Sequence, residues 1–311
     1  MRAPCYVRRV RKIALLAALA AAVAAVPAAA TLELGDNRVT LAVDGRTRDY
    51  IVHVPKLPPR KRRRGAPVFL YLPAEGMTAR QAAFLTGLSK FSDHDRFLAV
   101  FLDATRQPHD GFVGGRWNAG ACTGGPSAPC GGRAYHGGPA HAAGVDDVGY
   151  VRAVLVDLAT RIAIDPRRIY AFGHSEGGIM ASRLACEAGD VIAAVTVAEG
   201  AIEVPCDHPA RPVPVLLYHA VEDEVVPYDG NRDFPPVAHT FDAWRAIDGC
   251  AAPTVSRHHS RYSVEVARPC RGGSEVRLYT IAKGGNGWLL HAPAFVWQRV
   301  AWRFFRRHPL R

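Results

Sequence analysis

A serine flanked by glycines is the residue of this sequence best placed to do chemistry. It lies in Gly173-His174-Ser175-Glu176-Gly177-Gly178, after an apolar run at 169–172 and before a stretch with helical spacing. Glycines let the chain turn sharply, so a serine in a strand–turn–helix is pushed into the open beside the amides of a helix N-terminus. The G-x-S-x-G pattern in this setting predicts Ser175 as a nucleophile.

A serine nucleophile needs a base, and the base needs an orienting carboxylate. Asp223 follows the apolar run 213–219 and is the expected carboxylate, with Glu222 as the alternative. His291 is the expected base, although a histidine packed near the start of a helix is an equally open interpretation. The backbone amide of Glu176 is the expected oxyanion donor.

Alternating strands and helices are predicted to position these residues. The expected strands are 168–173, 191–198, 213–219 and 275–282, and the expected helices are 176–187, 237–248 and 293–306. Such alternation predicts an α/β fold, with a mostly parallel central sheet and helices on both faces. The carboxyl ends of parallel strands share one edge, so we expect Ser175, Asp223 and the 284–291 segment to meet there.

The first half of the chain is predicted to complete this sheet. Residues 38–43 and 49–54 alternate around Asp44-Gly45, which predicts a hairpin. Buried strands are expected at 67–72 and 97–102, a helix over 144–164 closed by Asp165-Pro166, and a long loop over 105–143.

The first thirty residues have the pattern of a secretory signal. Basic residues, ending at Arg11-Lys12, precede a short apolar run at 13–26 and the small residues Ala28-Ala29-Ala30. We therefore predict a signal peptide over 1–30, a single domain over 31–311 and a secreted protein; a retained N-terminal anchor is the alternative. Removing five positive charges from the formal +11 leaves +6.

Most of the remaining positive charge lies in Lys56 and Arg60 to Arg64. Proline and glycine flank this run, which predicts a solvated loop. Nucleic-acid binding would need basic residues spread over a face and interleaved with aromatics, so no nucleic-acid partner is expected. Loose attraction to an acidic cell surface fits better. The apolar run is too short for stable membrane insertion.

Six of the seven cysteines lie beyond the signal, in three sequential pairs. Fifteen pairings are open to six cysteines, and the favoured one joins 122 to 130, 186 to 206 and 250 to 270. A zinc site is the alternative, but no C-x-x-C motif supports it.

The mature chain resembles the secreted esterases of the polyhydroxybutyrate depolymerase and feruloyl esterase family, in the α/β-hydrolase superfamily. The resemblance rests on Asp44-Gly45-Arg46, Trp117-Asn118, Asp146-Asp147-Val148-Gly149, the run from Asp165 to Ser175, and the surroundings of Asp223. The sharp turn that carries Ser175 is called the elbow below. It implies hydrolysis of an ester through an acyl-enzyme, with no metal and no organic cofactor.

Two departures from the family pattern concern the catalytic groups. The family carries its base in Gly-Gly-His-x-Trp, and this sequence has Gly284-Gly285-Asn286-Gly287-Trp288. Asparagine has no basic nitrogen, so the base has to come from elsewhere, and His291 is the candidate. Leu72-Pro73 stands in place of the family's oxyanion His-Gly, which leaves Ala74 as the second donor.

The leading hypothesis is a secreted serine carboxylesterase acting on short-chain, aryl (feruloyl-like) or polyester (hydroxybutyrate-like) esters. The rival is a catalytically impaired homologue that binds an ester, a glycan or a partner. A serine peptidase is a weaker third hypothesis, because the chain lacks room for a gating domain.

Overall fold

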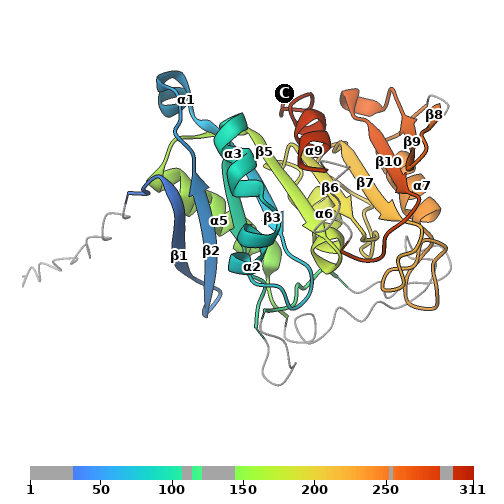
Figure 1. Ribbon diagram of the computed structural model, residues 1–311, viewed down its shortest axis with the longest axis horizontal. Coiled ribbons are helices and arrows are strands. Elements are labelled where there is room, and N and C mark those ends of the chain that lie inside the picture. Colours follow the sequence, from blue (N-terminus) through green and yellow to red (C-terminus); the bar gives the residue numbers. More distant parts are fainter. Residues whose placement is uncertain (1–30, 107–113, 121–143, 252–254, 288–296) are drawn as a thin grey trace, which may run out of the picture.

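In a computed structural model, residues 31–106, 114–120, 144–251, 255–287 and 297–311 are described, without the side chains of Arg62 and Val255. Their strands form one ten-stranded sheet in the order β1-β2-β4-β3-β5-β6-β7-β10-β9-β8 (Figure 1). The middle of the sheet, from β4 to β10, is parallel, and antiparallel strands extend both ends. The predicted α/β fold with a mostly parallel centre is confirmed, with a larger antiparallel share than the pattern indicated.

The strands that build this sheet are β1 (Gly35–Val43), β2 (Arg46–Val54), β3 (Ala66–Leu72), β4 (Leu98–Leu102), β5 (Ile164–His174), β6 (Ala194–Ala198), β7 (Val215–Ala220), β8 (Val255–His258), β9 (Tyr262–Ala267) and β10 (Val276–Ile281). The predicted hairpin around Asp44-Gly45 is β1–β2. The hairpin β8–β9 was not predicted.

The helices are α1 (Pro59–Arg64), α2 (Ala79–Leu85), α3 (Leu88–Asp95), α5 (Asp147–Arg161), α6 (Glu176–Glu187), α7 (Val237–Ile247) and α9 (Trp297–Phe305), with a short 3-10 turn η1 (Arg271–Gly273). The predicted bounds of α6 agree with the structure. The helix predicted to run to Ile164 ends at Arg161, because Ile162 is extended and Ile164 already pairs with Ala66 of β3.

Two hydrophobic cores cover the two faces of the sheet, because successive side chains of a strand point to opposite sides. On β3, Val68 and Leu70 face the core that holds α5, α6 and α7. Phe69 and Tyr71 face the core that holds α2, α3 and α9. The sheet is therefore covered by helices on both faces, as predicted.

The prediction that the basic run is a loop is wrong in part, because Pro59–Arg64 forms a short helix. Proline suits the first helical turn, where its missing N–H has no partner to lose, and arginine and lysine are good helix formers. The flanking proline therefore starts a helix here.

Two of the three expected disulfides are present, Cys186–Cys206 and Cys250–Cys270. The pair Cys122–Cys130 lies outside the described residues, as does the predicted signal at 1–30. In the part of the chain that the structure describes, no helix is long and apolar enough to cross a membrane.

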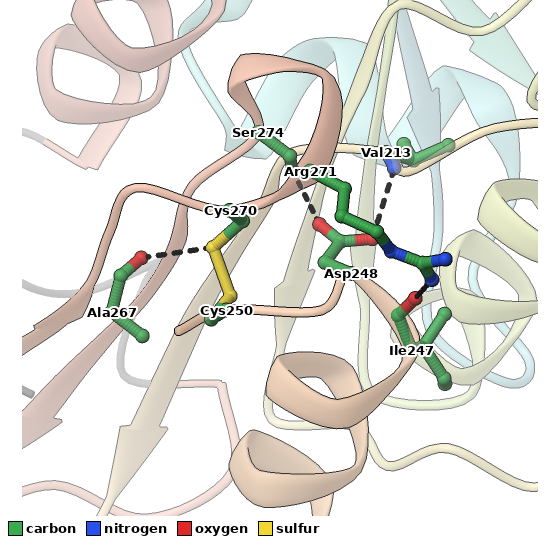
Figure 2. The surroundings of a disulfide bond; sticks show 8 residues. All are labelled: Val213, Ile247, Asp248, Cys250, Ala267, Cys270, Arg271 and Ser274. Carbon is green, nitrogen blue, oxygen red and sulfur yellow. Dashed lines mark hydrogen bonds between the residues drawn. A yellow bond between two sulfur atoms is a disulfide. The ribbon is translucent and has the colours of Figure 1, made fainter. Parts of the chain in front are cut away.

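A buried carboxylate lies beside the second disulfide (Figure 2). Asp248 accepts hydrogen bonds from the Val213 amide (3.1 Å) and the Ser274 hydroxyl. Arg271 points past it and donates to the Ile247 carbonyl at 2.7 Å. Burial raises the pKa of Asp248 to about 7, and the hydrogen bonds only partly offset that cost.

Candidate active site

Ser175 occupies a sharp turn between β5 and α6. Its φ of 54° lies in the left-handed region that a non-glycine residue rarely adopts. The turn is held because the Ser175 amide donates to the Ala198 carbonyl at 2.8 Å, while the Ser175 carbonyl accepts from Gly178 and Ile179. Backbone strain fixed in this way by its surroundings is typical of functional sites.

The glycines of the motif are required by close backbone approach. A Cβ on Gly173 would lie 1.8 Å from the Gly177 carbonyl oxygen. A Cβ on Gly177 would lie 2.1 Å from the carbonyl oxygen of Leu72. The end of β3 therefore lies directly against the start of α6, which brings the segment after Leu72 to the nucleophile.

That segment carries Ala74, one of the two expected oxyanion donors. The Trp117 indole donates to the Pro73 carbonyl at 2.9 Å, and the Ala74 carbonyl accepts from Met77 at 3.1 Å. Both contacts fix the turn that follows β3 and so hold Ala74 beside the elbow. The role of its amide as a donor stays a prediction.

Glu176, the other expected donor, is the first residue of α6. Its side chain is buried and accepts a hydrogen bond from the Trp117 amide at 3.0 Å. The carboxylate is thereby engaged by the chain at Trp117.

Asp223 lies just past β7 and is buried, with 3% of its surface exposed. Its Oδ1 accepts from the amides of Val225 and Val226, both at 2.9 Å, and His219 Nε2 lies 3.4 Å from its Oδ2. Burial raises the pKa of Asp223, but His219 and the two amides outweigh it, so the pKa is lowered below its usual value. Asp223 is thus held as a carboxylate, the form an orienting group requires.

Asn286 lies beside this carboxylate, at the position where the resemblance leads us to expect a histidine base. Its Nδ2 donates to Asp223 Oδ2 at 3.1 Å. Asparagine Nδ2 and histidine Nδ1 are both bonded to Cγ, so the amide makes the hydrogen bond that an imidazole would make here. The asparagine therefore preserves the contact without supplying a base.

Glu199, which the sequence analysis did not single out, connects the elbow to the loop of Asn286. It follows β6, is fully buried and has a φ of 52°. Its Oε2 accepts from His174 Nε2 at 2.8 Å and from the Gly287 amide at 2.6 Å. One carboxylate thus joins the residue before the nucleophile to the residue after Asn286. The available signal was an acid directly following a buried strand.

The other histidines and acids of the sequence analysis are distributed as follows. His291 lies outside the described residues. Glu222, the alternative carboxylate, is exposed and accepts from the Gly284 amide at 3.0 Å, so it supports the loop. Asp223 is accordingly the acid that contacts Asn286.

A buried ion pair ties the Trp117 segment to the edge of the sheet. Arg48 on β2 donates to Asp147 Oδ1 at 2.7 Å, and the Asn118 amide donates to the other oxygen at 2.6 Å. Burial raises the pKa of Asp147, and Arg48 partly counters it. The pair anchors the residues that contact Glu176 and Pro73.

The sheet order, the strained serine between β5 and α6, and the acid after β7 define an α/β-hydrolase fold. Solved structures agree. An acetyl xylan esterase from Aspergillus awamori matches with a TM-score of 0.60 at 14% identity, over 87% of this chain and 99% of that one. The poly(3-hydroxybutyrate) depolymerase LpqC from Bordetella parapertussis matches with a TM-score of 0.52 at 19% identity, over 88% and 95%.

Sequence relatives identify the family within this fold. "Putative esterase NocK" of Nocardia uniformis subsp. tsuyamanensis is 32% identical over 280 residues, which cover 80% of this chain and 72% of that protein. Feruloyl esterase B of Piromyces equi is 27% identical over 212 residues, 64% of this chain but only 35% of its own length. No family model matches the chain. The chain therefore belongs to the same esterase family as NocK and has the α/β-hydrolase fold.

Proposed function

We propose that this chain is a secreted serine carboxylesterase that hydrolyses short-chain, aryl or polyester esters through an acyl-enzyme. The observation that carries the proposal is the strained elbow at Ser175, linked through Glu199 and the loop of Asn286 to a buried, ionised Asp223. Membership of an esterase family supports the same activity. Two disulfides support export to an oxidising compartment.

In this mechanism Ser175 Oγ attacks the ester carbonyl while His291 takes its proton. The amides of Glu176 and Ala74 stabilise the oxyanion, and the alcohol leaves with the proton from His291. Water then attacks the acyl-enzyme and gives its proton to His291, and His291 returns a proton to Ser175 as the acid leaves. Asp223 orients the base. His291 is five residues beyond Asn286 in the same segment, which supports its assignment as the replacement base.

The names of the relatives supply the substrate classes to test. Feruloyl, acetyl-xylan and hydroxybutyrate esters differ in the acyl group, so p-nitrophenyl acetate and butyrate, methyl ferulate and a hydroxybutyrate oligomer separate them. All three ester classes are therefore included in the assay.

The test is the initial rate of p-nitrophenyl acetate and butyrate hydrolysis by wild type, Ser175→Ala and His291→Ala. Hydrolysis that both substitutions abolish supports the esterase with a displaced base. If Ser175→Ala abolishes activity and His291→Ala does not, Ser175 is supported as the nucleophile and the base is another group. A wild type no faster than Ser175→Ala supports the rival hypothesis of a binding homologue, which the contact of Asn286 with Asp223 also fits.

A further inference from the structure

Six exposed arginines on two helices form a surface that the proposed reaction does not use. Arg60, Arg63 and Arg64 lie on α1, and Arg299, Arg303 and Arg306 lie on or just after α9. We call these six the basic face. Within the described residues none of them forms an ion pair, whereas the exposed Arg38, Arg232 and Arg307 do.

Lys61 joins α1 to the end of α3. Its ammonium donates to the Asp95 and Arg96 carbonyls at the end of α3, at 3.4 and 2.8 Å. Burial lowers the pKa of Lys61 most, and repulsion from Arg168 and Arg306 lowers it further. A charge on α1 is therefore within electrostatic reach of the end of α9, and both helices lie along the upper margin of Figure 1.

A groove runs between α3 and α9. It has a volume of about 310 Å³ and is lined by Arg299, Arg303 and Arg306 together with His94 and Asp95. The carboxylates near the basic face are already occupied: Asp95 contacts His94 at 3.0 Å, and Asp165 is paired with Arg168 at 2.6 Å. The positive charge of the groove is thus left for a partner.

The basic face lies at the opposite edge of the sheet from the nucleophile. Arg168 and Ser175 are separated by seven residues of extended chain, which is roughly 23 Å. A polymer bound at the basic face would leave the elbow at Ser175 accessible. A partner held there therefore positions the enzyme without occupying its active site.

We propose that the basic face binds a carboxylated polysaccharide, a polymer of uronic acids. Arginine forks match carboxylates in geometry and charge, and spaced arginines on two helices suit a repeating anion. None of the exposed large apolar side chains of the described residues lies on α1 or α9, so neither helix itself presents an apolar anchor to a bilayer. Trp302 in the groove is buried, so its indole is not available to stack on bases.

The experiment is retention of Ser175→Ala protein in a gel containing polygalacturonate, which measures binding apart from catalysis. Retention is expected at about 20 mM salt and is expected to disappear near about 300 mM, as screening shortens the Debye length. A neutral glucan should give no retention. Arg299→Gln/Arg303→Gln/Arg306→Gln is expected to weaken binding about tenfold or more.

The matched control removes the same charge from the far end of the sheet. Arg257→Gln/Arg261→Gln/Arg268→Gln lies around β8 and β9, where the three side chains are also exposed. It is expected to bind within about twofold of the parent. Three results would overturn the proposal. The parent is not retained, both triple variants weaken binding equally, or the protein binds phosphatidylglycerol vesicles but not polygalacturonate. Unfolding temperatures check that both variants are folded.

Discussion

Asn286→His, introduced into a His291→Ala background, is expected to raise the esterase rate by about 10²- to 10⁴-fold, the usual contribution of a positioned general base. The structure supplies the reason. Asn286 Nδ2 already donates to Asp223 Oδ2 at 3.1 Å, and an imidazole Nδ1–H at the same branch point would keep that bond. The pKa of Asp223 is lowered, so the carboxylate is ionised and able to orient the ring.

The expected gain corresponds to about 2.7 to 5.4 kcal/mol of transition-state stabilisation, at 1.36 kcal/mol per decade. The Gly287 amide donates to Glu199 at 2.6 Å, and that bond is independent of the side chain at 286. The loop therefore keeps its position when the ring is introduced. The gain is expected in kcat, because the base acts only in the chemical steps.

The assay is the initial rate on p-nitrophenyl acetate for the His291→Ala, Asn286→His/His291→Ala and Asn286→Gln/His291→Ala proteins. Glutamine keeps an amide and adds bulk without adding a base. The reasoning is refuted if the histidine variant is folded but no faster than the glutamine variant. That result would mean that position 286 does not reach the proton of Ser175.

Three further predictions concern the supports of the site and the fold. Glu199→Ala is expected to lower kcat about 100-fold with little change in KM, because a small misplacement of catalytic groups is costly; recovery of most of the rate in Glu199→Gln identifies a positioning role, and equal loss in both variants contradicts it. The pKa of Asp248 is raised from 3.8 to about 7, so the folded state binds more protons in that window and the free energy of unfolding should fall as pH rises from about 4 to about 7. Asp248→Asn should remove this fall in urea titrations, and parallel curves for the two proteins would count against the assignment. Cys250→Ser/Cys270→Ser opens a loop with a sequence separation of 20 and is expected to cost about 3 kcal/mol of unfolding free energy in the chain-entropy description; a loss below about 1 kcal/mol in non-reducing conditions would contradict it.

The elbow and its helix were predictable because every local signal agreed. An apolar strand, glycines that permit close backbone approach and an apolar helical stretch all occur within residues 169–187. The β1–β2 hairpin was predictable for the same reason, since alternation and the Asp44-Gly45 turn indicate one structure.

Features that depend on distant segments were not predictable in this way. Glu199 acquires its role because three segments meet: the end of β5, the end of β6 and the loop after β10. The chain near Glu199 shows only an acid followed by a glycine. The α1 helix was assigned to a loop, because proline is compatible both with loops and with a first helical turn.

The hydrogen bond between Asn286 and Asp223 also bears on how this family changes over evolutionary time. Asparagine and histidine codons differ by a single base, and both residues satisfy the buried oxygen of Asp223 from the same side-chain position. An exchange between them leaves no unpaired buried carboxylate, so selection for stability does not resist it. A lineage can therefore lose or regain a base at this position by one substitution that costs little stability, while Ser175, Glu199 and Asp223 keep the geometry that would receive it.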